Sequence, residues 1–213
     1  TRGGPWTVPN QIFLSNSGWN GGGALENVSG DNAISGRVTV SSAAWIGANP
    51  GTTLTLTGGL TLNNQLWVTG GGTLNINTTP IANGGQALYA MNGGKINLSV
   101  ASTGWTGDLD AREPGSRITL SGAATVGSGG NVVARAGGTV VFDNSATAVT
   151  NRAYNKGLVL DNGTFIYRLG TGAASEQFAQ FQTRWGANRF VIENDSAVSS
   201  TISFSGAAPI LNG

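Results

Sequence analysis

The sequence predicts an all-β fold, a parallel β-solenoid built from coils of roughly 22 residues. The first observation is the composition: glycine supplies 35 of the 213 residues, and charged residues make up only 10% of the chain. The second is that the 39% of hydrophobic residues fall in short, β-branched runs between glycine-rich turns. Such runs favour packed strands over a disordered linker. The third observation is a repeated motif.

A six-residue motif recurs along the chain, in which a glycine-rich turn is followed by apolar, polar and apolar residues. The first apolar residues of its copies are Leu54, Leu74, Ile96, Ile118, Val140 and Phe165, at intervals of 20, 22, 22, 22 and 25 residues. A nearly fixed interval is typical of solenoids, in which each coil buries its apolar face against the next. We therefore expect Leu74, Ile96, Ile118 and Val140 to form one internal ladder, with successive Cα atoms about 5 Å apart. An antiparallel sandwich is the alternative, but it has no reason to repeat one motif at a fixed interval.

A second strand is predicted before each turn. Residues 66–68, 88–90 and 132–134 each begin eight residues before the first apolar position of the next motif, as in 74 − 66 = 8. The segment 108–111 breaks this register by one residue, which would turn an aspartate toward the core at a high cost. We expect a local bulge that turns Leu109 and Ala111 inward instead.

The N-terminal segment differs from the rest of the chain. Residues 1–30 lack the motif and contain Trp6 and the apolar run Ile12-Phe13-Leu14. Because a solenoid needs atypical terminal coils, we interpret residues 1–30 as an N-terminal cap or arm and residues 31–213 as the solenoid. Residues 175–186 fit either a short amphipathic helix or a strand, and the flanking motifs favour a strand.

Catalytic chemistry finds little support in the sequence. The chain has no histidine and no cysteine, which removes the usual nucleophile–base pairs and the usual zinc, copper and haem ligands. The best acidic cluster contains Asp108, Asp110 and Glu113, which as paired carboxylates could cleave a polysaccharide or bind calcium. A solvated loop is the interpretation we favour for it, and a surface turn for Glu193 and Asp195. We predict that the protein is not an enzyme, and we assign no catalytic, cofactor-binding or metal-binding residue.

The charge distribution and hydropathy of the chain argue against a nucleic-acid partner and against a membrane span. Eleven basic and ten acidic residues are scattered singly, without the basic cluster that nucleic-acid binding requires. No apolar run approaches the roughly 20 residues that span a bilayer. We therefore expect neither a nucleic-acid partner nor a membrane span. Six tryptophans are many for this length, and Trp67 and Tyr89 occupy equivalent positions of neighbouring coils. Packing is the interpretation we favour for the tryptophans, but this pair is the best candidate for an exposed platform that stacks on sugar rings.

The segment from Asn151 to Gln177, followed by residues 186–192, resembles the autotransporter-associated β-strand repeat of large bacterial surface and secreted proteins. The resemblance is closest over residues 115–206 and looser over residues 35–114, and residues 1–30 do not share it. It implies a right-handed parallel β-helix that is secreted or lies at the cell surface. The family has no common catalytic residues to transfer. Because the chain begins without methionine or a signal segment, we expect a processed protein or a segment of a longer one.

Two functions follow as hypotheses. The first is an extracellular structural protein, a rigid solenoid acting as a surface stalk, a passenger segment or a self-assembling filament subunit. The second is a β-helix that binds or cleaves polysaccharides. For the first, we expect copies to associate head to tail, because the end coils of a stack need a cover. The residues expected at such a contact are Trp6, Ile12, Phe13, Leu14, Ile202, Phe204, Ile210 and Leu211.

Overall fold

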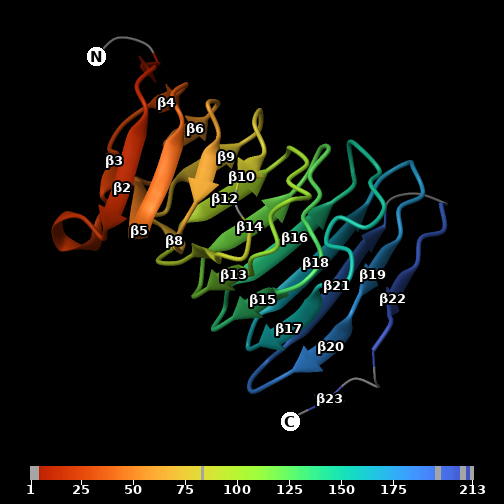
Figure 1. Ribbon diagram of the computed structural model, residues 1–213. Helices are drawn as coiled ribbons and strands as arrows, with labels where there is room; N and C mark the ends of the chain where they lie inside the picture. The colour runs from red at the N-terminus through yellow and green to blue at the C-terminus, as the bar shows by residue number, and fades with distance from the viewer. Residues whose placement is uncertain (1–4, 83, 195–197, 207–209, 212–213) are drawn as a thin grey trace.

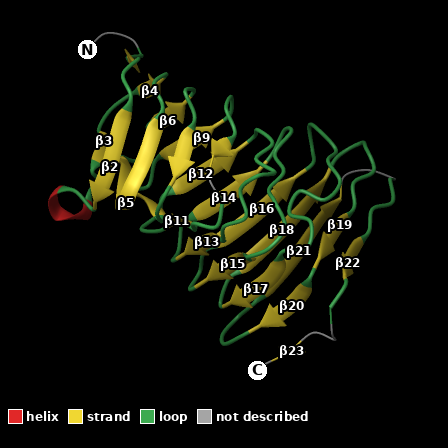
Figure 2. Cartoon of the chain, viewed as in Figure 1, coloured by secondary structure: helices red, strands yellow, loops and turns green. Residues whose placement is uncertain are grey.

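The computed structural model describes residues 5–82, 84–194, 198–206 and 210–211, which form a stack of parallel strands with the two chain ends at opposite ends of the stack (Figure 1). Strands make up nearly all of the regular structure, and the described residues contain one short helical turn, Trp19–Gly21 (Figure 2). Every strand pair is parallel, which confirms the predicted β-solenoid. The sheets form because each coil contributes one strand to each side.

The first sheet has nine strands. In spatial order they are β1 (Thr7–Val8), β4 (Asp31–Ile34), β6 (Thr53–Leu56), β9 (Thr73–Ile76), β12 (Lys95–Leu98), β14 (Arg117–Leu120), β16 (Thr139–Asp143), β18 (Thr164–Leu169) and β21 (Arg189–Asn194). At about 4.8 Å per coil, nine coils make a rod of roughly 45 Å.

The second sheet has twelve strands. They are β10 (Ile81–Ala82), β7 (Leu60–Leu62), β5 (Val38–Ala48), β8 (Leu66–Thr69), β11 (Leu88–Ala90), β13 (Leu109–Arg112), β15 (Asn131–Arg135), β17 (Gly157–Asp161), β20 (Gln180–Thr183) and β23 (Ile210–Leu211), with β2 (Ile12–Asn16) and β3 (Leu25–Asn27) both paired to β5. A short third sheet joins β19 (Glu176–Phe178) to β22 (Ile202–Phe204).

The predicted ladder is confirmed. Ile96 pairs with Leu74 on one side and with Ile118 on the other, and Ile118 pairs with Val140. The side chains of all four are fully buried between the sheets. Alternation along each strand turns the apolar residues of the motif inward and the polar residue outward, which is why the motif repeats once per coil.

A glycine precedes β9, β12, β16 and β18 and lies against the backbone of the preceding coil, whereas Thr52 and Ser116 hold this position before β6 and β14. A Cβ atom at Gly94 would lie 2.3 Å from the carbonyl oxygen of Val68, and one at Gly138 would lie 2.2 Å from that of Ala111. No side chain can occupy such a position without moving the coil. The recurring glycine therefore allows the coils to stack closely.

The irregular segment before Arg112 behaves as predicted in its apolar residues. Leu109 pairs with Leu88, Ala111 pairs with Ala90, and both side chains point into the core. The connection before β13 is one residue shorter than in the next coil (109 − 98 = 11 against 132 − 120 = 12), and the turn after β13 is one residue longer (118 − 109 = 9 against 140 − 132 = 8). It follows that the true neighbours of Asp110 along the stack are Tyr89 and Val133.

The two ends of the chain add coils to the same stack. β1 pairs with β4, and β2 and β3 pair with β5, so residues 7–27 wrap as a first coil on the sheets that residues 31–194 form. Residues 175–186 contain β19 and β20, which confirms the strand assignment over the helix.

Candidate functional site

The connections between the first and second sheets are longer in the C-terminal half, and residues 144–156 enclose a buried polar cluster there. Arg152, Lys156 and Glu176 are at most 1% exposed. Charged side chains are almost never buried unless they are paired or fully hydrogen-bonded. These three therefore need partners, which neighbouring coils supply.

Arg152 satisfies its guanidinium with backbone carbonyls. It donates from Nη1 to the carbonyl oxygen of Ala124 at 2.9 Å and from Nε to Oδ1 of Asn144 at 2.9 Å. Its Nη2 donates to the carbonyls of Gly122, Asp143 and Thr147. The planar fork of arginine, with five donors, suits such a convergence of acceptors. The residue thus ties its own coil to the preceding one.

Lys156, in the same connection between β16 and β17, binds backbone carbonyls in a similar way. Its ammonium donates to the carbonyl oxygens of Thr106 at 2.9 Å, Gly107 at 2.8 Å and Gly129. The ammonium also lies 5.7 Å from the ring centroid of Trp105, in a cation–π contact. Burial lowers the pKa of Lys156 to about 8, against the opposing charge of Asp108. Lys156 therefore connects three successive coils.

Glu176 closes the cluster from the following coil. Its two carboxylate oxygens accept the backbone N–H groups of Arg152 at 2.8 Å and Ala153 at 3.0 Å. Burial raises the pKa of Glu176 to about 7, although those two donors and the charge of Arg152 oppose the rise. We call Arg152, Lys156 and Glu176 the buried clamp. Its groups face carbonyls and amides of the backbone, an arrangement that holds coils together.

The buried clamp predicts a pH dependence of stability. Because the folded-state pKa of Glu176 is about 7 and its ordinary value is 4.5, the folded state holds this proton more tightly than the unfolded state. The contribution of Glu176 to the free energy of unfolding should be fully present below pH 4.5 and should fall by roughly 3 kcal/mol as the pH rises through 7. The chain has no histidine whose titration would obscure this window. Urea denaturation between pH 4.5 and 7.5 measures the slope.

Glu176→Gln should flatten that slope. Glu26→Gln is the matched control, because it removes an exposed carboxylate and should leave the slope of the parent protein unchanged. A Glu176→Gln protein that keeps the full slope would assign the titration to another group.

A row of aromatic rings runs along the outside of the second sheet. Trp45, Trp67 and Tyr89 occupy successive rungs and are half-buried. The rings of Trp67 and Tyr89 are stacked, with centroids 5.0 Å apart and planes 15° apart, and the centroids of Trp45 and Trp67 are 6.4 Å apart. The guanidinium of Arg112 lies over the other face of Tyr89, 4.4 Å from its centroid. The faces of Trp67 and Tyr89 thus contact protein groups, and mainly ring edges remain for solvent.

The acidic cluster differs from the solvated loop that the sequence suggested. Asp110 lies in β13 and is only 2% exposed. Its Oδ2 lies 2.9 Å from Nη2 of both Arg112 and Arg135, in two ion pairs. Asp108 is half-buried, and its Oδ1 accepts the backbone N–H of Asn131. These carboxylates are bound by residues of their own coil and of the next coil, which corrects the loop interpretation for Asp110.

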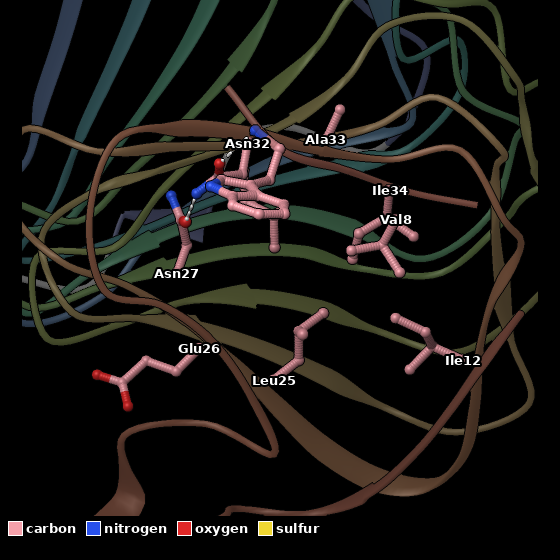
Figure 3. Close-up of a pocket in the computed structure, with 10 residues that line it drawn as sticks. Val8, Ile12, Leu25, Glu26, Asn27, Asn32, Ala33 and Ile34 are labelled. Atoms are coloured by element: carbon pink, nitrogen blue, oxygen red, sulfur yellow. Dashed lines mark hydrogen bonds between the residues drawn. The ribbon is translucent and has the colours of Figure 1, made fainter. Parts of the chain in front are cut away.

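The N-terminal end of the stack is open. A pocket of about 190 Å³ lies inside the first coil, lined by apolar side chains that include Val8, Ile12 and Leu25, with Asn27 and Asn32 on its wall (Figure 3). The side-chain amide of Asn32 donates to Oδ1 of Asn27 at 2.7 Å, and the amide of Asn27 donates to the carbonyl of Thr53. The pocket continues the apolar core at the end of the stack where β1 is the edge strand of the described residues.

The residues predicted for self-association divide between exposed and buried positions. Trp6 and Phe13 are exposed, whereas Ile12, Ile202 and Phe204 are half-buried against the core. Leu14 is buried inside the first coil, with only 3% of its surface exposed. Ile210 and Leu211 form β23, which pairs with β20, and their side chains lie outside the described residues.

Metal and membrane features are scarce within the described part of the chain. No three acidic side chains converge there to hold a metal ion. No helix among those residues has the length and hydrophobicity that a membrane crossing would need. Asp195 lies outside the described residues, and Glu193 is bound to Arg168, with Oε2 2.7 Å from Nε.

Sequence reasoning gave no role to Arg152, Lys156 or Glu176. One available signal was the longest motif interval, 25 residues between Val140 and Phe165, which places extra chain where the buried clamp lies. Comparisons of the chain with protein-family models, with curated proteins and with solved structures find no match.

Proposed function

We propose that the chain is an extracellular structural protein, a rigid β-solenoid that serves as a surface stalk, a passenger segment or a filament subunit. The proposal rests on the observation that the buried charged side chains bind the protein's own backbone. Arg152 and Lys156 bind backbone carbonyls of other coils, and Glu176 binds backbone amides. Groups with perturbed pKa values in an enzyme usually line a cleft that a substrate can enter. Here the buried clamp is closed, and its perturbed groups stabilise the stack.

Rigidity follows from how the coils are joined. Parallel ladders pair the backbone of each coil with its two neighbours, and the apolar rows pack continuously between the sheets. The buried clamp adds charge-assisted hydrogen bonds across four coils, and such bonds are about twice as strong as neutral ones. Such a rod keeps its length under load, which is the property a stalk or fibre requires.

The extracellular location is supported by sequence. The segment from Asn151 to Gln177 resembles the autotransporter-associated repeat, whose members lie at or beyond the bacterial surface. All three charged residues of the buried clamp, Arg152, Lys156 and Glu176, lie within that segment and have a structural role here. Protease treatment of intact producing cells tests the location: surface exposure predicts loss of the protein without cell lysis, and protection would contradict it.

Two properties of the purified chain test the structural role: its shape, and whether it binds or cleaves polysaccharides. Electron microscopy and small-angle scattering of the purified chain should show rods whose solenoid length is roughly 45 Å per copy. A glycan array combined with a reducing-sugar assay should show neither binding nor cleavage. Cleavage that is lost in Asp110→Asn would contradict the proposal and would establish a polysaccharide-cleaving protein.

Carbohydrate binding remains the second proposal, through the aromatic row of Trp45, Trp67 and Tyr89. Half-exposed aromatic rings in a line suit a linear polysaccharide. The argument against it is that the Trp67 and Tyr89 rings stack on each other and under Arg112. If the array does show binding, Trp67→Ala should abolish it, and Trp185→Ala, which removes an exposed ring elsewhere, should leave it unchanged.

A further inference from the structure

The two ends of the stack expose side chains that belong to the same core rows. Val8 in β1 and Ile192 in β21 are the first and last members of one row, whose intervening members from Ile34 to Tyr167 are buried. Ile192 is 58% exposed, and no strand of the described residues pairs with the outer edge of β21. Within the described residues, the row is therefore an apolar ladder whose two end members, Val8 and Ile192, are exposed.

A second row shows the same pattern. Trp6 precedes β1 and lies opposite Asn32, in the row that runs from Leu54 through Phe165 to Phe190. From Leu54 to Phe165 this row is buried, whereas Trp6 is 70% exposed and Phe190 is half-buried. Two large apolar residues at one end thus match two at the other, at the same positions of the strand.

We propose that the N-terminal face of one copy binds the C-terminal face of another, with β1 of the second copy pairing in parallel with β21 of the first. Thr7 then lies opposite Val191, Val8 lies against Ile192, and Trp6 lies against Phe190. This contact rests on the structural role proposed above and specifies how copies join. It is heterologous, so it produces an open filament or a closed ring depending on the rotation between copies.

The shapes of the two faces support a second copy as the partner. The first coil surrounds the pocket of about 190 Å³ that is lined by Val8, Ile12 and Leu25. The opposite face carries a cluster of partly buried phenylalanine rings, in which the centroids of Phe181 and Phe190 are 5.9 Å apart and those of Phe181 and Phe204 are 5.4 Å apart. Stacking would cover both the hollow and the rings.

Charge also distinguishes the two faces. The first coil has exposed Glu26 and Asp31, and no basic residue lies between residues 5 and 34. The last coil has exposed Arg184 and Arg189, while its Glu193 is bound to Arg168. Asp31 begins β4 and Arg189 begins β21, at equivalent positions of the first sheet. At the proposed junction, β1 of the second copy would lie between these two strands, so the two residues would be about 10 Å apart. Opposite charges at that range steer association at low salt.

Engineered cysteines test the proposed register in the full chain, which has no cysteine of its own. The double variant Thr7→Cys/Val191→Cys places two outward positions on adjacent strands, about 4.8 Å apart between Cα atoms. That spacing lies within the range of about 4.4–6.8 Å that disulfides span. Mild oxidation should convert the monomer into a series of multimers on a non-reducing gel, and reduction should reverse it.

Pro9→Cys/Val191→Cys is the matched control. It has the same number of thiols but shifts one of them by two residues, to a diagonal separation of about 7–8 Å. We expect this variant to lose the multimer series. Far-UV circular dichroism of both variants should match the parent chain, which establishes that they fold.

Several results would overturn the junction. The proposed contact is wrong if Thr7→Cys/Val191→Cys folds but stays monomeric, or if both double variants crosslink equally. It is also wrong if the parent chain sediments as a monomer at high concentration. The ends would then be covered by something other than a second copy. A rod-shaped monomer that neither binds nor cleaves glycans would leave the proposed structural role intact, whereas glycan cleavage would contradict that role instead.

Discussion

Replacing Arg152 with methionine should lower the free energy of unfolding by about 3–5 kcal/mol. The side chain donates to Oδ1 of Asn144 and to backbone carbonyls that include those of Ala124 and Asp143. A methionine fills similar space but leaves these buried acceptors unpaired, and each unpaired group costs about 1–3 kcal/mol. Glu176 also loses the nearby positive charge that opposes its raised pKa. Urea denaturation followed by circular dichroism measures the change.

Arg184→Met is the control for this prediction. Arg184 is exposed at the end of β20, so its replacement should change stability by no more than about 0.5 kcal/mol. If Arg152→Met proves as stable as Arg184→Met, the buried clamp does not hold the coils together, and the main support for a purely structural role is lost.

Ile118→Asp should be the most damaging single change in the middle of the rod. Ile118 is fully buried between Ile96 and Val140 in the first sheet. A carboxylate there has neither a hydrogen-bond donor nor a cation in the row, so we expect a loss of at least about 4 kcal/mol or failure to fold. Because each coil contacts mainly its neighbours, the damage should start at this coil and spread outward. Hydrogen exchange locates it.

Thr119→Asp provides the comparison at the adjacent position. Thr119 points outward, is partly exposed, and its hydroxyl accepts from Nε of Arg117 at 3.2 Å. An aspartate there can accept the same bond, so stability should change by less than about 1 kcal/mol. Similar losses for the two variants would mean that inward and outward positions are wrongly assigned in this strand.

The internal ladder could be predicted because the spacing between equivalent residues of neighbouring coils is enough to define it. A solenoid repeats one environment per coil, so the interval between Leu74, Ile96, Ile118 and Val140 directly gives the rise from one coil to the next. The inward turn of Leu109 and Ala111 could be predicted for a similar reason, since placing an aspartate inward would have cost too much. Each of these inferences needs only one coil and its neighbour.

The role of Asp110 could not be predicted in the same way. Its neighbours Arg112 and Arg135 are visible in the sequence, but the one-residue shift before β13 decides that Arg135 lies on the adjacent rung. An acidic run beside a turn looks solvated until that register is known. The same holds for Tyr89, whose outward position was predicted but whose contact with Arg112 depends on the shift.

The sequence alone determined the solenoid, its period and the direction in which each motif residue points, because those properties repeat with every coil. Only the tertiary structure decided where the charges lie. The partners of Lys156 are 27, 49 and 50 residues away, on loops that have no repeated pattern. A buried charge is stable only where several acceptors converge, and that convergence depends on how unequal loops of successive coils lie on one another. Leu14 lies inside the first coil while Phe13 beside it is exposed, because successive side chains of β2 point to opposite faces of the sheet.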